Sequence, residues 1–201
     1  MTADDDTLTL WLAREEGLNA LRREPGLARQ EDVAGRTGLQ IFEAMLLGDL
    51  PPPPIAKTLD FALVEAAFGR AEFQGWPQFA HYNPLGSVHG GWIATLLDSA
   101  LGCAVHTTLP LGKAYTTLEL KVNFVKAVTD RVPRVRAIGQ VIHAGARTAT
   151  ADARLGGPDG TLFAHATTTC LIFDAGAARR ADTANPANPA NPTSPTSSAR
   201  P

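Results

Sequence analysis

The fold of this chain is decided by residues 81–100, which have the sequence HYNPLGSVHGG followed by WIATLLDSA. The first part is polar and rich in glycine, and the Asn-Pro pair together with the glycines is typical of a loop. The second part is strongly apolar and predicts a helix. A loop that leads directly into a helix leaves free backbone N–H groups with partial positive charge. We therefore expect this junction to hold a carbonyl oxygen or an anion.

The helix expected after Gly91 is amphipathic and should end near His106. Its apolar stripe has a period of 3.6 residues and consists of Ile93, Leu96, Leu97, Ala100, Leu101 and Ala104. Small residues flank this stripe, so other elements can pack closely against the helix. This pattern indicates a central helix wrapped by a sheet.

Four segments after the helix have the alternation of strands. Between residues 115 and 125 we expect two faces, one with Leu118, Leu120, Val122 and Phe124 and the other with Thr117, Glu119, Lys121 and Asn123. The other three strands are expected at residues 134–143, 147–155 and 162–173. Two further strands are expected before the helix, at residues 62–68 and 70–75. The order β-β-α-β-β-β-β, with long antiparallel hairpins, is an α+β layout.

The two ends of the chain differ from this central part. Residues 1–50 are expected to form a helical extension, which the prolines at 51–54 end because proline cannot continue a helix. Lys57 to Phe61 is expected to form one short turn. The extension holds ten acidic and five basic residues, which argues against DNA binding and favours packing on the core. Residues 175–201 repeat Ala-Asn-Pro without large apolar residues and predict a disordered tail.

Composition excludes several classes of protein. The net charge of −2 gives no electrostatic case for nucleic acid or a membrane surface as partner. No signal peptide or apolar run of about 18 residues is present, so a cytoplasmic location is expected. The two cysteines, Cys103 and Cys170, lie in apolar surroundings and are expected to be reduced.

The central part resembles the phenylacetate-pathway (PaaI-like) group of hotdog-fold acyl-CoA thioesterases. The resemblance rests on His81-x-Asn83-Pro84-x-Gly86-x-x-His89-Gly90-Gly91 followed by Thr95-Leu96-x-Asp98, and it extends over about residues 55–174. It implies an antiparallel sheet wrapped around the helix, and an acyl-CoA substrate hydrolysed to a carboxylate and free CoA. It also implies homodimers joined edge to edge, which often pair into homotetramers. Neither a metal nor a cofactor is implied.

Hydrolysis of a thioester needs a donor for the developing oxyanion and a carboxylate that acts as base or nucleophile. The donor is expected at the helix N-terminus, where the resemblance favours the Gly90 amide and Gly91 is a further substrate contact. The carboxylate is expected to be Asp98. Eight residues of helix separate Gly90 from Asp98 by ~12 Å, too far for one carbonyl to meet both. We therefore expect Asp98 of one subunit to work beside Gly90 of the other, and the monomer to be inactive.

Five more residues are candidates for the site. The resemblance implies that Asn83 places the water or the carbonyl, although an Asn before Pro also initiates turns. His89 either orients the thioester or fixes the loop through a backbone carbonyl. Thr117 matches a position where the group often has a hydroxyl near the water. Arg147 and Thr148 lie where the group often contacts the phosphates or pantetheine of CoA.

Two alternative functions remain open. The first is a hotdog enoyl-CoA hydratase or dehydratase, but Asn83 stands where such enzymes place an Asp, and Asn is no base. The second is a non-catalytic acyl-CoA sensor, which would not need Asp98. If Tyr82, Trp92 and Leu97 line the acyl pocket, aryl-acetyl or medium-chain acyl groups are favoured.

Overall fold

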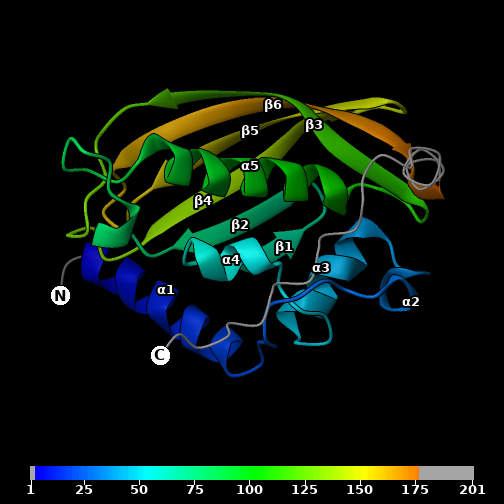
Figure 1. Cartoon of the computed structure of the whole chain (residues 1–201), viewed down its shortest axis with the longest axis horizontal. Helices are drawn as coiled ribbons and strands as arrows, with labels where there is room; N and C mark the ends of the chain where they lie inside the picture. The colour runs from blue at the N-terminus through cyan, green and yellow to red at the C-terminus, as the bar shows by residue number, and fades with distance from the viewer. Residues whose placement is uncertain (1–2, 177–201) are drawn as a thin grey trace, which may run out of the picture.

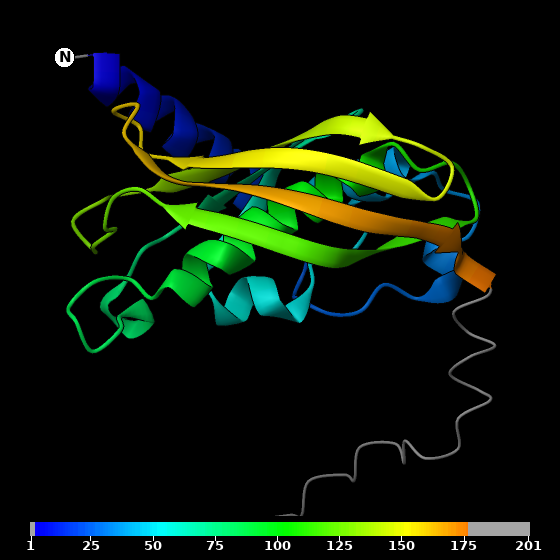
Figure 2. The ribbon, with the colours of Figure 1, turned by 90° about the horizontal axis from the view of Figure 1, so that it is seen from above.

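A single antiparallel sheet curls around one long helix, as two perpendicular views show (Figures 1 and 2). This computed structural model describes residues 3–176. The strands are β1 (Phe61–Ala67), β2 (Arg70–Gly75), β3 (Lys113–Phe124), β4 (Val135–Ala144), β5 (Thr148–Gly156) and β6 (Leu162–Asp174). They lie in the order β1-β2-β4-β5-β6-β3, and the helix α5 (Gly90–Thr107) contacts all six of them. The predicted α+β class and the order β-β-α-β-β-β-β are confirmed.

The apolar stripe predicted on α5 faces the sheet. Its six residues are each exposed by 3% or less, and burial of each large side chain contributes ~1.5–3 kcal/mol. The helix and the sheet approach one another most closely at Gly139 of β4. A Cβ atom there would lie 2.3 Å from the carbonyl oxygen of Ala100, so only glycine allows this contact. The helix therefore holds a fixed position in the sheet, and with it the polar side chains on its other faces.

The prediction for the faces of β3 is wrong in its first half. The pairing of β3 with β6 shifts between Thr117 and Glu119, so Leu118 is the extra residue of a β-bulge. One extra residue reverses the faces: Leu118 is 60% exposed, whereas Thr117 is partly buried and turned toward α5. Thr117 therefore shares the helix side of the strand with Leu120, instead of facing away from it.

The extension before β1 consists of helices, as predicted. They are α1 (Ala3–Asn19), α2 (Gln30–Val33) and α3 (Gly38–Leu46). A further short helix, α4 (Pro54–Thr58), begins at the last of the four prolines and includes Lys57 and Thr58, so the turn expected at residues 57–61 is confined to residues 59–60. Proline is favourable at the first helical position, because its missing N–H is not needed there. The proline run thus ends one helical region and starts another.

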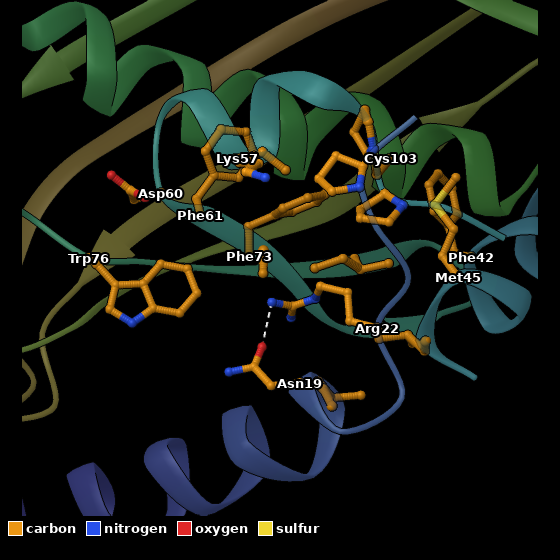
Figure 3. A pocket seen from close by; sticks show the side chains of 18 of the residues that line it. Asn19, Arg22, Phe42, Met45, Lys57, Asp60, Phe61, Phe73, Trp76 and Cys103 are labelled. Carbon is orange, nitrogen blue, oxygen red and sulfur yellow. Dashed lines mark hydrogen bonds between the residues drawn. The ribbon is translucent and has the colours of Figure 1, made fainter. Parts of the chain in front are cut away.

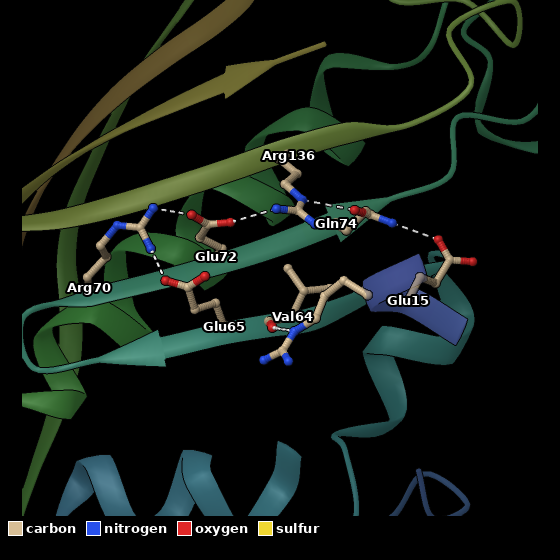
Figure 4. Close-up of polar contacts among 8 residues, drawn as sticks. Glu15, Val64, Glu65, Arg70, Glu72, Gln74 and Arg136 are labelled. Atoms are coloured by element: carbon tan, nitrogen blue, oxygen red, sulfur yellow. Dashed lines mark hydrogen bonds and ion pairs between the residues drawn. The ribbon is translucent and has the colours of Figure 1, made fainter. Parts of the chain in front are cut away.

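A polar network attaches α1 to the outer face of the sheet (Figure 4). Glu15 of α1 accepts hydrogen bonds from Gln74 at 2.6 Å and from Arg134 at 2.8 Å. Burial raises the pKa of Glu15, but its bonds to Arg134, Gln74 and Trp76 and the charge of Arg134 outweigh that effect and hold the pKa below its ordinary value. The network continues through Arg136, which donates to Gln74 at 2.9 Å. The acidic extension therefore packs on the core, as its composition predicts.

A disordered tail is predicted at residues 175–201. Of these, residues 177–201 lie outside the described residues. Within residues 3–176, no helix combines the length and the apolar character that crossing a membrane requires.

Candidate active site

The loop before α5 is closed by its own side chains. Asn83 accepts hydrogen bonds at Oδ1 from the N–H groups of Leu85 (2.8 Å) and Ser87 (3.4 Å), and its Nδ2 donates to Ser87 Oγ. His81 anchors the base of the loop, since its carbonyl accepts from the His89 N–H at 2.7 Å and its ring stacks on Trp92. This arrangement gives Asn83 the role of a turn former; its catalytic role stays a prediction.

The two glycines that open α5 differ in what their amides do. His89 is the N-cap, and its Nδ1 accepts from the Gly91 N–H at 2.8 Å. Neutral His89 therefore carries its proton on Nε2. The Gly90 N–H has no acceptor among residues 3–176, so it is the amide left for a ligand oxygen. Between the two amides that the sequence offered, the geometry favours Gly90.

Asp98 lies near the middle of α5 and is partly exposed. Thr117 donates its hydroxyl to Asp98 Oδ1 at 3.2 Å, a contact that exists because the bulge at Leu118 turns Thr117 toward the helix. Asp98 Oδ2 has no hydrogen-bond partner within the described part of the chain, so it is accessible to water or substrate. The structure thus brings Asp98 and Thr117 together on the flank of α5 that faces the edge strand β3.

Gly90 and Asp98 belong to one uninterrupted helix, Gly90–Thr107. At ~1.5 Å per residue, their separation along the axis is ~12 Å. Gly90 instead lies against Phe124 at the end of β3, where a Cβ on Gly90 would be 3.0 Å from the ring. One protomer therefore presents two separate halves of the predicted site along β3, Asp98 beside Thr117 and Gly90 beside Phe124.

Arg147 and Thr148 lie away from both halves. Thr148 pairs with Leu171, which pairs in turn with Thr116, so it is level with the start of β3. The side chain of Thr148 is exposed, and its neighbour Ala149 is fully buried against the helix side. Thr148 consequently lies on the opposite face of the sheet from Asp98. A contact of these two residues with CoA stays a prediction.

The remaining reactive side chains near Asp98 are kept neutral. Burial and, to a smaller degree, the charge of Asp98 raise the pKa of Cys103 to about 12. Burial likewise raises the pKa of Tyr115 above its ordinary value. Both cysteines are free thiols. In the stretch from residue 3 to residue 176, no three metal-ligating side chains gather. Asp98 is therefore the group in this cluster that is suited to act as a base or nucleophile.

Known proteins match this chain in sequence and in fold. The model of the thioesterase superfamily matches residues 85–164, which include the second half of the loop, α5 and the bulged strand. A phenylacetic acid degradation-related protein from Ralstonia eutropha is 30% identical, with 65% of this chain and 98% of that one covered at a TM-score of 0.59. The chain belongs to the thioesterase superfamily. Its fold is the hotdog fold, and it is PaaI-like, as the resemblance implied.

Other solved members of the superfamily share the same part of the fold. A thioesterase family protein from Silicibacter pomeroyi is 27% identical, with 60% of this chain and 90% of that one covered at a TM-score of 0.56. A variant of the phenylacetic acid degradation protein PaaI from Thermus thermophilus is 26% identical, with 59% and 97% covered at a TM-score of 0.53. The search of curated proteins found no match. In each comparison, at least a third of this thioesterase-superfamily chain has no counterpart.

A cavity of about 490 Å³ lies outside the predicted site (Figure 3). It is bounded by α1, α3, α4, the start of the sheet and Cys103 of α5. Tyr82, Trp92 and Leu97, the residues expected to line the acyl pocket, do not line this cavity, and Trp92 and Leu97 are buried in the core. Their place in an acyl pocket shared by two subunits stays a prediction. Sequence analysis missed Arg22, which the cavity contains. The sequence offers one sign of its role: Arg22 is a cation that lies next to the apolar Leu18 and Leu21 in the chain.

Proposed function

We propose that this member of the superfamily is an acyl-CoA thioesterase, with Asp98 as base or nucleophile and the Gly90 amide as the donor to the carbonyl oxygen. One observation carries the proposal. On a single helix of a thioesterase-superfamily fold, one end offers an unused N–H group and the middle offers a carboxylate with one unused oxygen. These are the two groups that hydrolysis of a thioester requires.

The chemistry assigns each group one task. The Gly90 N–H, with the positive end of the α5 dipole behind it, stabilises the oxyanion that forms when the thioester carbon is attacked. Asp98 either removes a proton from the attacking water or attacks the carbon itself to form an anhydride that water then hydrolyses. The C–S bond breaks, and CoA leaves as a thiol with the proton released from water. Thr117 holds the carboxylate in place through its hydroxyl.

Assembly of two chains supplies the missing contact between the halves. β3 is an edge strand of 12 residues, and within residues 3–176 its one paired neighbour is β6. It exposes Leu118 and Phe124 by 60% and 58%. A long edge with exposed apolar side chains favours pairing with another strand. Antiparallel pairing of two β3 strands about a twofold axis would bury these side chains and extend the sheet. As a second step of the same proposal, two such dimers pair into a tetramer.

The required position of the twofold axis follows from the contacts of one protomer. Asp98 lies beside Thr117, and Gly90 lies beside Phe124. For Asp98 to meet Gly90 of the partner subunit, Thr117 must lie opposite Phe124 of the partner subunit. Because Leu118 is the extra residue of the bulge, the axis then passes at Lys121, which lies opposite Lys121 of the partner subunit, and close to the middle of the Gly90–Asp98 segment of α5. A disulfide between two copies of a Lys121→Cys variant would support this register.

A product assay separates hydrolysis from the alternatives. The purified protein is given phenylacetyl-, hydroxybenzoyl-, hexanoyl- and palmitoyl-CoA, and the free thiol is measured. A parallel assay follows hydration of a 2-enoyl-CoA through the loss of the conjugated double bond. We expect thiol release from at least one acyl-CoA and no hydration. Hydration without thiol release, or binding of acyl-CoA without turnover, would contradict the proposed function.

A further inference from the structure

The cavity under the extension is separate from the proposed reaction site. None of Asn83, His89, Gly90 and Asp98 lines it. It reaches α5 at Cys103, which follows Asp98 by five residues and therefore points ~140° away around the helix. Apart from Cys103, every lining residue lies between positions 18 and 78, before the start of the family match at residue 85. The cavity is thus built mainly by residues that precede the family match.

The walls of the cavity are predominantly apolar. They include Leu18 from α1, Phe42 and Met45 from α3, and Phe61, Leu63 and Phe73 from the first hairpin. A volume of about 490 Å³ falls in the range of sites for small organic molecules, ~300–1,000 Å³. Such a space suits an apolar chain or ring system.

One charged group in the cavity lacks an ionic partner. Arg22 is partly buried, and Figure 3 shows its side chain directed into the cavity among the aromatic rings. Within the described part of the chain, its one hydrogen bond goes from Nη1 to Asn19 Oδ1, a neutral acceptor, at 2.6 Å. No carboxylate among residues 3–176 forms an ion pair with it. Because a guanidinium has five N–H donors, most of its hydrogen-bonding capacity is unused.

The other charges at the cavity are already satisfied. Lys57 is paired with Glu24 at 3.5 Å and its side chain is 73% exposed, and Asp60 faces His81 at 3.3 Å. Burial lowers the pKa of Arg22 below its ordinary value, and the more distant charge of Glu15 only partly opposes this effect. A partly buried cation without a counter-ion is costly, and an anion placed beside it would remove that cost.

We infer that this cavity is a second ligand site, which binds an amphipathic carboxylate with its apolar part between α3 and the first hairpin and its carboxylate on Arg22. The class includes free fatty acids and aryl-alkanoic acids. A planar guanidinium and a carboxylate form two parallel N–H···O bonds, which fixes the orientation of the ligand. The site does not depend on the reaction at Asp98, and the two are tested separately.

Calorimetric titration with decanoate and with the uncharged decanamide tests the inference. We expect one decanoate to bind per chain. The affinity for decanamide should be lower by about tenfold or more, because decanamide lacks the ionic contact. Arg22→Gln should lower the affinity for decanoate to that for decanamide and leave decanamide binding unchanged. The matched control is Arg23→Gln, since Arg23 is exposed and bonds to the Asp49 carbonyl outside the cavity.

Two more variants place the ligand. Met45→Trp fills the cavity and should abolish binding of both probes, whereas Asp98→Asn should leave both affinities unchanged. The inference is overturned if decanoate does not saturate, if it binds Arg22→Gln as tightly as the unaltered chain, or if Asp98→Asn removes its binding. Should Arg22→Gln fail to fold, the difference between decanoate and decanamide on the unaltered chain and the loss in Met45→Trp still decide the question.

Discussion

The two ends of α5 differ in accessibility: the first residue is accessible to a ligand, whereas the last turn is covered by α3. Gly90 has an unused N–H and lies beside an exposed loop. At the other end, the carbonyl of His106 lies so close to α3 that a Cβ on Gly38 would be 1.8 Å from it. The His106 ring contacts Phe42 and Tyr115, and burial lowers its pKa below the ordinary value.

The difference shows how the superfamily fold and the extension divide the helix. The N-terminal half follows the family pattern and keeps its polar groups available for chemistry. The C-terminal half is covered by α3, which precedes the family match at residue 85, and it contributes to packing and to the cavity. We therefore expect substitutions at the first half to change the rate of hydrolysis with little change in stability, and substitutions at the second half to do the reverse.

The largest expected effect is that of Asp98→Asn on the open half. The amide keeps the shape of the side chain and its acceptor for Thr117, but it removes the base or nucleophile. The kcat for the best acyl-CoA should fall by about 10²-fold or more, with an unchanged melting temperature. Ser99→Ala, the adjacent position on the same helix, is the control and should retain activity. Equal activity of Asp98→Asn would remove the distinction between the two halves.

Gly38→Ala tests the enclosed half. The added methyl group must displace α3 from the end of α5, which should lower the free energy of unfolding by about 1–3 kcal/mol while the kcat per folded molecule is kept. Gly17→Ala is the matched control, because nothing lies within 4 Å of its Cβ position and alanine favours helix α1 by about 0.5–1 kcal/mol. Urea unfolding of both variants measures the opposite signs. A loss of kcat in Gly38→Ala would show that the two halves are coupled.

The attachment of α1 should depend on pH through Glu15. Its pKa in the folded chain is below the ordinary value of 4.5, so the stability it contributes is present above about pH 4.5 and is lost as the pH falls through the folded pKa. Melting temperatures of the unaltered chain and of Glu15→Gln should differ at pH 7 and converge toward pH 3. Glu16→Gln, at an exposed neighbouring position, should show no such convergence. A constant difference at all pH values would contradict the role assigned to Glu15.

The smallest expected effect belongs to Thr117→Val. The loss of one hydrogen bond to Asp98 should lower kcat by about two- to tenfold. Thr116→Val, on the exposed face of β3, should leave kcat unchanged. If both substitutions have the same effect, the bulge at Leu118 does not serve the site.

The sequence predicted what depends on local patterns and missed what depends on pairing. The stripe on α5 and the alternation of the strands are local, so the elements and their order could be predicted. The bulge in β3 interrupts no alternation between Tyr115 and Phe124; it is decided by the pairing with Thr169 and Cys170 on β6. The direction of Thr117 toward Asp98 therefore could not be predicted.

The same reason explains the missed extension contacts. Glu15 meets Gln74 and Arg134, which are 59 and 119 residues away. The cavity around Arg22 needs four segments that are separated in the chain. The periodicity of a single segment cannot predict contacts between distant segments. The pattern from His81 to Asp98 lies within one segment and could therefore be recognised.

The donor amide at Gly90 can be removed with little change to the backbone. Proline lacks the N–H, and it is well suited to the first position of a helix. His89 has φ −60° and ψ 134°, a conformation that a residue before proline readily adopts. Gly90→Ala is the control, because it places a Cβ against Phe124 in the same way but keeps the N–H.

Mixing Gly90→Pro with Asp98→Asn tests the shared site most directly. Each variant alone should be nearly inactive. In a mixed dimer, one of the two sites combines the intact Gly90 of one chain with the intact Asp98 of the other. Refolding the two variants together in equal amounts should therefore restore about a quarter of the activity of the unaltered protein, because half of the dimers are mixed and each has one intact site. Activity that stays at the level of the separate variants would contradict the account.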